Sequence, residues 1–292
     1  MKLDFQEFVE EVVKVAQDIL GADYKVGKRT VTKMNSVNLT GVCIAAKDAV
    51  LEGCMYLDYI YESAYCEKGE EVRTITENLL NKYLEDSMED RIDLNVMESW
   101  EWVKEPLFCK LINTEMNQEL LKDTPHREVM DLSVVYYMCL DKEQGATILV
   151  KDWMMEYWGQ SEESLYQQAM TNIQDHGCLD VIDMHEIVKE TCGVDTDAKG
   201  IMYVIRDLAI PYGAVHMLNE KAIQKVKEVL GEAFIILPSS VWEVIAVPIS
   251  ECEHADRLAT RVRDINNTSV LPEEILSNHV YGYRNGKFEI LA

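Results

Sequence analysis

The chain has 292 residues, of which 48% are hydrophobic and 27% are charged, and this balance is typical of a folded globular protein rather than a disordered one. Acidic residues number 52 against 28 basic residues, which gives a formal net charge of −24. A surface this negative repels phosphate backbones and anionic lipid head groups, so we expect a partner that is neither a nucleic acid nor a membrane.

The first third of the chain predicts a helix, a pair of strands and further helical stretches. Apolar residues recur at helical spacing over residues 5–20, and a glycine follows as a stop signal. Two segments rich in Val and Thr, residues 24–32 and 37–45, predict a hairpin. Apolar positions over residues 70–83 again mark one face of a helix. The acidic stretch over residues 86–93 is the candidate linker.

The rest of the chain alternates further strands and helices. Residues 132–140 and 146–150 predict a hairpin, and Ser161 is placed to cap the helix that follows. Residues 174–199 have weak helical periodicity and contain glycines, so irregular peripheral structure is expected there. The elements expected beyond them are a strand at 201–206, a helix from Asn219 to Gly231, a helix over 255–265 and a terminal hairpin around Asn285 and Gly286.

One stretch, residues 234–248 with the sequence FIILPSSVWEVIAVP, predicts a hairpin at the centre of a sheet. Its two apolar runs are short and rich in β-branched residues, and Pro238, Ser239 and Ser240 between them supply turn chemistry. Glu243 is the only charged residue in the stretch. We therefore expect Glu243 either to point away from the sheet or to have a partner.

Eight cysteines are present, and most of them lie in apolar runs, as Cys43 and Cys139 do. Such cysteines are typical of buried free thiols, so we expect no disulfide. The sequence begins directly with an amphipathic pattern, without the apolar core of a signal peptide, and no run approaches the roughly 18 apolar residues of a membrane-spanning helix. We therefore expect a cytoplasmic location.

The closest approach to a metal motif is a set of histidines and cysteines over residues 176–192. Structural zinc sites usually pair their ligands roughly two to five residues apart. The set, which comprises His176, Cys178, His185 and Cys192, lacks a second close pair. A phosphate-binding glycine-rich loop, a Gly-x-Ser-x-Gly elbow and a Cys-x-x-Cys pair do not occur in the sequence either. The sequence therefore predicts neither a metal nor a cofactor.

Ser239 and Ser240 are candidate nucleophiles at the turn of the central hairpin, with Glu243 close by in the sequence. A nucleophilic serine needs a base within hydrogen-bonding reach, so the fold would have to bring His126 or His216 to the turn. The alternative is that both serines are ordinary turn residues after a proline. The candidate binding residues are therefore Ser239, Ser240, Glu243 and His126, and no catalytic residue is assigned.

Several separated segments of the chain form a recognisable set. They are Lys110-Leu111-Ile112-Asn113 with Asn117, Pro125-His126-Arg127 with Asp131-Leu132, Trp158-Gly159, Tyr212-Gly213-Ala214, Ile236 to Pro248, Asn266, Pro272-Glu273-Glu274, Leu276-Ser277 and Val280-Tyr281. Through this set the chain resembles, over most of its length, an uncharacterised bacterial family catalogued as domain of unknown function 5688. The resemblance implies no activity, cofactor or catalytic residue.

These patterns together predict an α+β fold in two regions. Residues 1–95 are expected as an N-terminal helix-hairpin-helix region. Residues 96–292 are expected as a C-terminal α+β domain, in which a mixed or antiparallel sheet contains the central hairpin and carries helices on one side.

Two hypotheses about function stay open at this point. The favoured one is a cytoplasmic, non-enzymatic binding or adaptor protein whose partner is another protein. The alternative is a small-molecule enzyme, a hydrolase, with its site at the central hairpin. An exposed apolar patch would favour the first hypothesis, and a deep polar pocket at the hairpin would favour the second.

Overall fold

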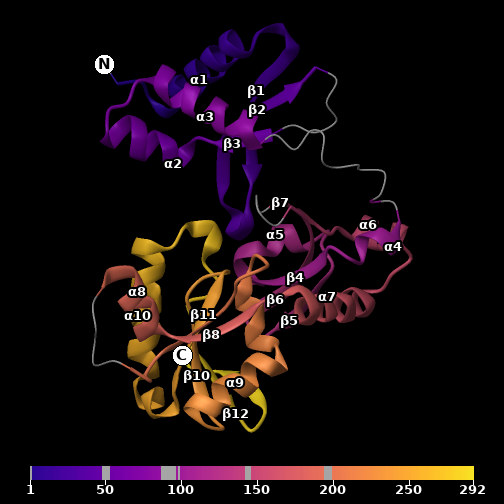
Figure 1. Ribbon diagram of the computed structural model, residues 1–292, viewed down its shortest axis with the longest axis vertical. Helices are drawn as coiled ribbons and strands as arrows, with labels where there is room; N and C mark the ends of the chain where they lie inside the picture. The colour runs from indigo at the N-terminus through magenta and orange to yellow at the C-terminus, as the bar shows by residue number, and fades with distance from the viewer. Residues whose placement is uncertain (1, 48–52, 87–96, 98, 142–145, 194–198) are drawn as a thin grey trace. The chain divides into compact units, whose positions relative to one another are not determined.

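The computed structural model describes residues 2–47, 53–86, 97, 99–141, 146–193 and 199–292 (Figure 1). The chain divides into two compact units: unit 1 comprises Met1–Lys33 and Val37–Leu94, and unit 2 comprises Met34–Ser36 and Asn95–Ala292. The described residues contain helices and three antiparallel sheets, so the expected α+β class is confirmed. The linker expected over residues 86–93 lies, apart from its first residue, outside the described residues.

Unit 1 begins with a capped helix. The Asp4 side chain accepts a hydrogen bond from the Glu7 backbone N–H, and the Glu7 side chain accepts one from the Asp4 N–H. Gly21 ends the helix at a φ of 70°, which glycine adopts without steric cost. The elements of this unit are α1 (Phe5–Leu20), β1 (Tyr24–Thr32), β2 (Asn38–Ala46), β3 (Gly53–Tyr56), α2 (Asp58–Ile60), a π-helical segment (Tyr61–Glu67) and α3 (Val72–Asp86).

The sheet of unit 1 has the order β1-β2-β3, with both pairings antiparallel. The two strands expected over residues 24–32 and 37–45 pair as β1 and β2. The sequence analysis did not predict strand β3. Its four residues are all half-buried, so the strand has no alternation of buried and exposed positions that a sequence pattern could reveal. Phe8 of α1, Ile44 of β2 and Leu80 of α3 meet in the core on one face of this sheet.

Unit 2 contains two sheets. The four-stranded sheet has the order β4-β6-β5, with β7 also paired to β6, and the six-stranded sheet has the order β13-β12-β10-β11-β9-β8. The elements are α4 (Trp100–Val103), β4 (Leu107–Asn113), α5 (Gln118–Leu121), β5 (His126–Val129), β6 (Leu132–Asp141), β7 (Ala146–Leu149), α6 (Asp152–Tyr157), α7 (Glu162–His176), β8 (Leu179–Asp183), α8 (Met184–Cys192), β9 (Tyr203–Asp207), α9 (Glu220–Leu230), β10 (Phe234–Pro238), β11 (Glu243–Pro248), α10 (Ala255–Ser269), β12 (Tyr281–Arg284) and β13 (Lys287–Ile290).

The predicted central hairpin is confirmed, because β10 and β11 pair antiparallel in the middle of the six-stranded sheet. The last pair of the register is Pro238 opposite Val244. Strand β11 begins at Glu243, two residues later than the apolar run suggests, because the Val241 N–H donates to the Glu274 carbonyl (2.9 Å) and leaves the strand ladder. The sequence analysis also expected helices on only one side of this sheet, and that expectation is wrong.

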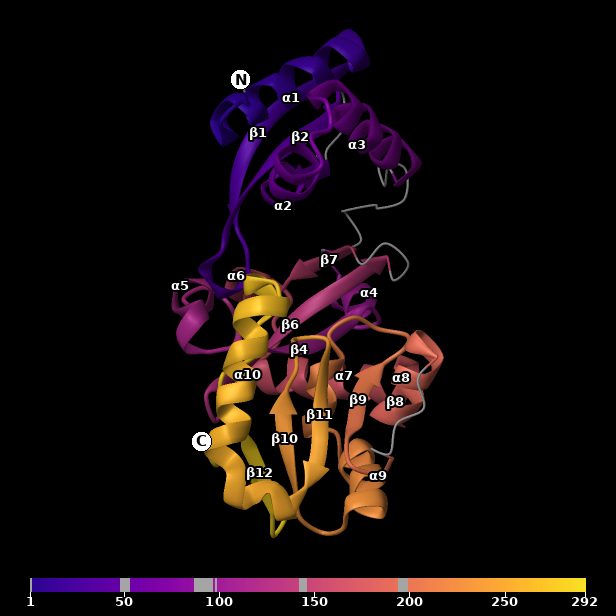
Figure 2. The same ribbon diagram turned by 90° about the vertical axis from the view of Figure 1, so that its left-hand side faces the viewer.

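Helices pack on both faces of the six-stranded sheet (Figure 2). Phe234 and Ile236 point into a core that they share with Val226 of α9, whereas Ile235 and Val247 point into a second core with Val262 of α10. Successive side chains of a strand point to opposite faces. An uninterrupted apolar run therefore requires that both faces of the strand are covered.

The expectation of irregular structure over residues 174–199 is also wrong. This segment holds β8, an edge strand of half-buried residues, and α8. The Asp183 side chain caps α8 by accepting from the His185 N–H (3.0 Å), and Gly193 ends it at a φ of 67°. Cap and stop signals were present in the sequence, but the apolar residues between them are only Met184, Ile187, Val188 and Cys192. None of the described helices is long and apolar enough to cross a membrane.

Candidate functional site

The structure brings together three of the four candidate binding residues at the turn of the central hairpin. The Ser239 hydroxyl donates to a Glu243 carboxylate oxygen (3.3 Å). The Ser240 hydroxyl oxygen accepts from the Trp242 N–H (3.1 Å), and the Ser240 N–H donates to the Glu243 carbonyl (3.1 Å). Glu243 stands opposite Arg206 of β9 in the register. Both serines therefore make the local bonds that are typical of turn residues.

His126 lies in the other sheet of unit 2, opposite Val135 on β6. Its Nδ1 atom is 2.8 Å from the Thr124 carbonyl oxygen. Within the part of the chain that the structure describes, no hydrogen bond joins a histidine to Ser239 or Ser240. The described residues therefore give neither serine the histidine base that a nucleophile requires.

His216 instead forms a sealed pair with Asp207 at the end of β9. The His216 Nε2 atom lies 2.6 Å from Asp207 Oδ2, and the two side chains are 1% and 0% exposed. The Asn219 amide lies 3.2 Å from His216 Nδ1, so we assign the amide as donor to Nδ1 and place the ring proton on Nε2, facing Asp207. Backbone N–H groups of Cys178, Ala209 and Ile210 complete the shell of Asp207.

These bonds explain the acidity of Asp207. Burial raises the pKa of its carboxyl, but hydrogen bonds from His216 and from three backbone N–H groups outweigh burial and bring the pKa below its ordinary value. The pair joins the end of β9 to the turn over Gly213–Leu218. Because neither side chain reaches solvent, the Asp207–His216 pair is a structural link rather than a site.

A second histidine–carboxylate pair is open to solvent, and it is the centre of the candidate site. Asp131 Oδ2 accepts from the Ser277 hydroxyl (2.7 Å) and lies 3.0 Å from His279 Nδ1, while Oδ1 accepts from the Tyr281 hydroxyl (2.9 Å). The Asp131 side chain is 18% exposed and the His279 side chain is 47% exposed. We call Asp131, Ser277, His279 and Tyr281 the Asp131 cluster.

The backbone before Asp131 is strained. Val129 pairs with Leu132, so Met130 and Asp131 form a two-residue turn between β5 and β6, and Met130 has a φ of 60°. A bulky side chain rarely occupies this left-handed region, which costs of the order of 1–3 kcal/mol. The bonds of the Asp131 side chain, and the Thr114 N–H that donates to the Asp131 carbonyl (2.9 Å), hold the turn in place.

The Asp131 cluster is open to solvent, but it does not have the arrangement of a serine-nucleophile triad. In a triad the serine hydroxyl is bonded to the histidine and the carboxylate orients the histidine from the other side. Here Ser277 and His279 both bind Asp131 directly. The carboxylate therefore orients the imidazole through Nδ1, which we assign as the protonated ring nitrogen, so that Nε2 is the acceptor.

Sequence analysis missed the Asp131 cluster, because Ser277 and His279 lie 146 and 148 residues from Asp131 along the chain. Only the resemblance gave a signal, since Asp131, Ser277 and Tyr281 all belong to the segments that carry it. Among the described residues no group of three or more His, Cys, Asp or Glu side chains could hold a metal ion. The expectation of no metal stays a prediction.

Helix α6 carries two exposed aromatic side chains. Trp153 is 63% exposed and Tyr157 is 62% exposed. Trp158, directly after the helix, is buried. Its indole N–H donates to the Met97 carbonyl (2.9 Å), and its ring centroid lies 6.2 Å from that of Trp100. Met154 and Met155 also pack on the core. The helix is therefore held from one side while its two aromatic residues face solvent.

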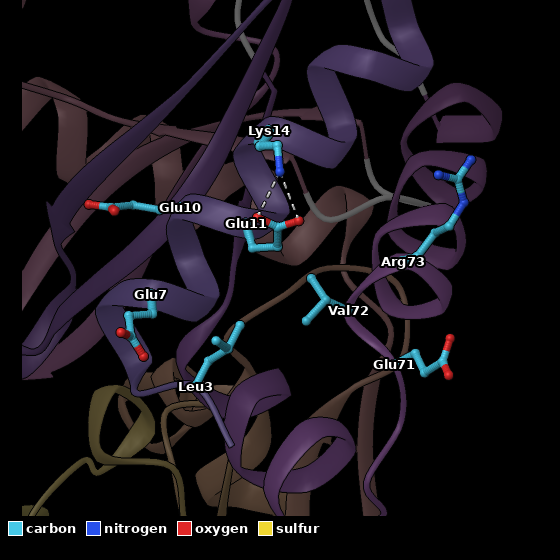
Figure 3. Close-up of a pocket in the computed structure, with 8 residues that line it drawn as sticks. All are labelled: Leu3, Glu7, Glu10, Glu11, Lys14, Glu71, Val72 and Arg73. Carbon is cyan, nitrogen blue, oxygen red and sulfur yellow. Dashed lines mark hydrogen bonds and ion pairs between the residues drawn. The ribbon is translucent and has the colours of Figure 1, made fainter. Parts of the chain in front are cut away.

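Surface hollows also lie in other parts of the described chain. A hollow of about 720 Å³ lies between α1 and the start of α3, and Figure 3 shows its largely charged lining. Lys14 pairs with Glu11 (3.2 Å) and Arg73 with Glu77 (2.9 Å), each within one helix and exposed to solvent. Such exposed pairs contribute little, so this hollow is an ordinary charged surface. A further hollow, of about 520 Å³, runs along α7 and is lined by Trp100, Gln160, Ser161, Glu163, Ser164, Gln167, Gln168 and Thr171.

Comparison with known proteins identifies a family but no function. No curated protein and no solved structure matches the chain. A family model matches residues 5–285, nearly the whole length, and its description is a family of unknown function. The resemblance found from the separated sequence segments is thereby confirmed: the chain belongs to the DUF5688 family.

Proposed function

We propose that the protein binds another protein through the aromatic face of α6, which consists of Trp153 and Tyr157. The observation that carries the proposal is the exposure of these side chains, 63% and 62%. Aromatic residues bury the largest apolar areas of all side chains. Trp and Tyr are also the residues most enriched at the energetic centres of protein interfaces.

The aromatic face is prepared for binding by the way α6 is seated. Trp153 and Tyr157 are four residues apart, so they project from one side of the helix. Trp158, fixed by its bond to the Met97 carbonyl, anchors the end of the helix in the core. Trp and Tyr side chains have only two torsions each, so they lose little conformational freedom on binding, which leaves more of the contact energy for affinity.

Charge indicates the kind of partner. Glu156 is exposed within the same helix, and the whole chain carries a formal charge of −24. We therefore propose a basic protein with an apolar pocket for the aromatic face, because opposite charge speeds and orients association. A second copy of this chain, a nucleic acid or an anionic membrane would each bring like charges together. The setting we propose is the cytoplasm of a bacterial host, with residues 1–95, arranged as helix-hairpin-helix, and residues 96–292 as separate domains.

The hydrolase hypothesis receives less support from the geometry. Ser239 has a carboxylate neighbour, Glu243, at 3.3 Å, and His126 is bonded to Thr124 in the other sheet. A hydrolase built on this hairpin would have to use Glu243 as the base for Ser239, without a histidine between them.

The test compares three forms of the full chain in affinity capture from an extract of the native host. They are the wild type, the double variant Trp153→Ala/Tyr157→Ala and the control Ile265→Ala, which removes an apolar residue that is 53% exposed on α10. We expect a basic protein that is retained by the wild type and the control, is reduced roughly tenfold in the double variant, and is released by added salt.

A photo-reactive amino acid in place of Tyr157 then connects the captured protein to α6. We expect a covalent crosslink to the same basic protein, and titration of that purified protein should change the tryptophan fluorescence of the wild type. Equal capture by all three forms, or a crosslink pattern that does not include the captured protein, would overturn the proposal.

A further inference from the structure

Two cysteines of unit 1 lie opposite each other on neighbouring strands. Cys43 of β2 pairs in register with Cys54 of β3, and their sulfur atoms are 2.8 Å apart. Opposed residues of an antiparallel pair have Cα atoms about 4.5–5.5 Å apart, and a disulfide requires about 4.4–6.8 Å between Cα atoms. The strand pairing alone therefore holds these cysteines at a spacing that suits a disulfide.

Gly41 provides the space for the Cys54 sulfur. A Cβ atom at position 41 would lie 2.5 Å from Cys54 Sγ and 2.9 Å from the Met55 carbonyl oxygen. Residues 41 and 43 stand on the same face of β2, so the missing side chain at position 41 leaves room for the sulfur on the face that carries Cys43. Backbone geometry as well as the side-chain rotamer thus brings the two sulfur atoms together.

We propose that Cys43 and Cys54 form a reversible disulfide, with a low-molecular-weight disulfide such as oxidised glutathione as the oxidant. The Cys54 thiolate attacks one sulfur of the oxidant, and the first glutathione thiol leaves. The Cys43 thiolate then attacks the Cys54 sulfur, and the second glutathione thiol leaves. Two protein thiols are oxidised to one disulfide, one oxidant molecule is reduced to two thiols, and both protons of the protein thiols end on glutathione.

Accessibility sets the order of these steps and the choice of cysteines. Cys54 is half-buried, whereas Cys43 is 5% exposed, so the oxidant reaches Cys54 first. Cys109 behaves differently, because burial raises the pKa of its thiol to about 12 and keeps it protonated near neutral pH. The structure records no disulfide among the described cysteines. The sequence-based expectation of no disulfide would then hold only under reducing conditions.

The test counts thiols in the full chain after equilibration with glutathione buffers. Cys178 and Cys192 are exposed, and Cys66 and Cys252 are half-buried as Cys54 is, so all four would form adducts with glutathione. The parent protein therefore carries serine at these four positions and keeps four of the eight cysteines. Remaining thiols are alkylated in denaturant and counted by intact mass. We expect the count to fall by two in a single step as the oxidised fraction rises, and dithiothreitol to restore it.

Two further results decide the assignment. Digestion of the oxidised protein should give a linked pair of peptides that contain Cys43 and Cys54. The added variant Cys43→Ala should lose the link and instead hold one glutathione on Cys54. A count that stays at four at every glutathione ratio, or a link between other cysteines, would overturn the proposal. Digestion of the oxidised wild type without substitutions provides the same readout if the parent variant folds poorly.

Discussion

Two histidine–carboxylate pairs in unit 2 use the same chemistry in opposite surroundings. In the sealed pair, His216 Nε2 and Asp207 Oδ2 are 2.6 Å apart and the side chains are 1% and 0% exposed. In the open pair, His279 Nδ1 and Asp131 Oδ2 are 3.0 Å apart and the side chains are 47% and 18% exposed. The atoms in contact differ little, so it is burial that decides what each pair can do.

A sealed pair has to be satisfied by protein groups alone, and Asp207 accordingly accepts from three backbone N–H groups as well as from His216. An open pair can exchange protein partners for water or for a ligand, because solvent satisfies its free ring nitrogen. We therefore expect the Asp207–His216 pair to stabilise the fold. Any binding or catalysis at the candidate site is expected at the Asp131–His279 pair.

The largest effect is expected at the sealed pair. In Asp207→Asn one acceptor oxygen becomes an NH2 donor. This donor must face either the His216 ring N–H or the backbone N–H groups, and all of these buried donors lose their charged acceptor. Breaking a buried pair in this way costs about 3–5 kcal/mol. The free energy of unfolding from urea titrations measures the cost, and a loss below about 1 kcal/mol would show that the pair is not structural.

The matched change at the open pair should cost less. Asp131→Asn weakens the bonds from Ser277 and His279, and it also weakens the bond from Tyr281, whose side chain is buried. Hydrogen bonds to a charged group contribute about 1.5–3 kcal/mol, and water can replace part of what is lost at an exposed carboxylate. We expect a loss of about 2 kcal/mol in the same urea titration. A loss equal to that of Asp207→Asn would remove the distinction between the pairs.

The elements that sequence analysis predicted are those whose signals are local. Helix α1 has its cap at Asp4, its apolar stripe and its stop at Gly21 within one short stretch. The terminal turn is similar, since Asn285 and Gly286 have φ values of 50° and 80°, and the Asn-Gly dipeptide alone favours such a turn. Ser239, Ser240 and Glu243 also meet as expected, because a turn brings near neighbours together.

The features that it missed depend on packing between distant segments. Asp131 lies in a turn of one sheet and His279 lies just before β12 of the other, so no spacing rule connects them. His126 was proposed as a partner of the hairpin serines, but the strand register places it opposite Val135. A sequence pattern identifies Trp153 only as an apolar residue. The packing of α6 is what shows that its side chain faces solvent.

Acid should weaken the protein through the sealed pair. The pKa of Asp207 is below its ordinary value of 3.8 in the folded chain, so the unfolded chain takes up a proton at a higher pH than the folded chain does. The stability from Asp207 is complete above that ordinary value and is lost as pH falls towards the folded pKa. Between about pH 5 and pH 3, the wild type should therefore lose stability more steeply than Asp207→Asn, which has no carboxyl there. Parallel urea midpoints for the two proteins across this range would contradict the assignment.

The smallest effect is expected when the open histidine is removed. His279 is 47% exposed and shares Asp131 with Ser277 and Tyr281, which remain bonded after His279→Ala. We expect a loss of about 0.5 kcal/mol or less, as for an ordinary surface change. The matched variant His216→Ala leaves a buried carboxylate without its partner and should cost about 3 kcal/mol or more. Thermal and urea unfolding of the two variants compares the pairs directly. Equal losses would show that His279 is a structural residue like His216, whereas a stable His279→Ala protein preserves the fold in which ligands of the Asp131 cluster can be sought.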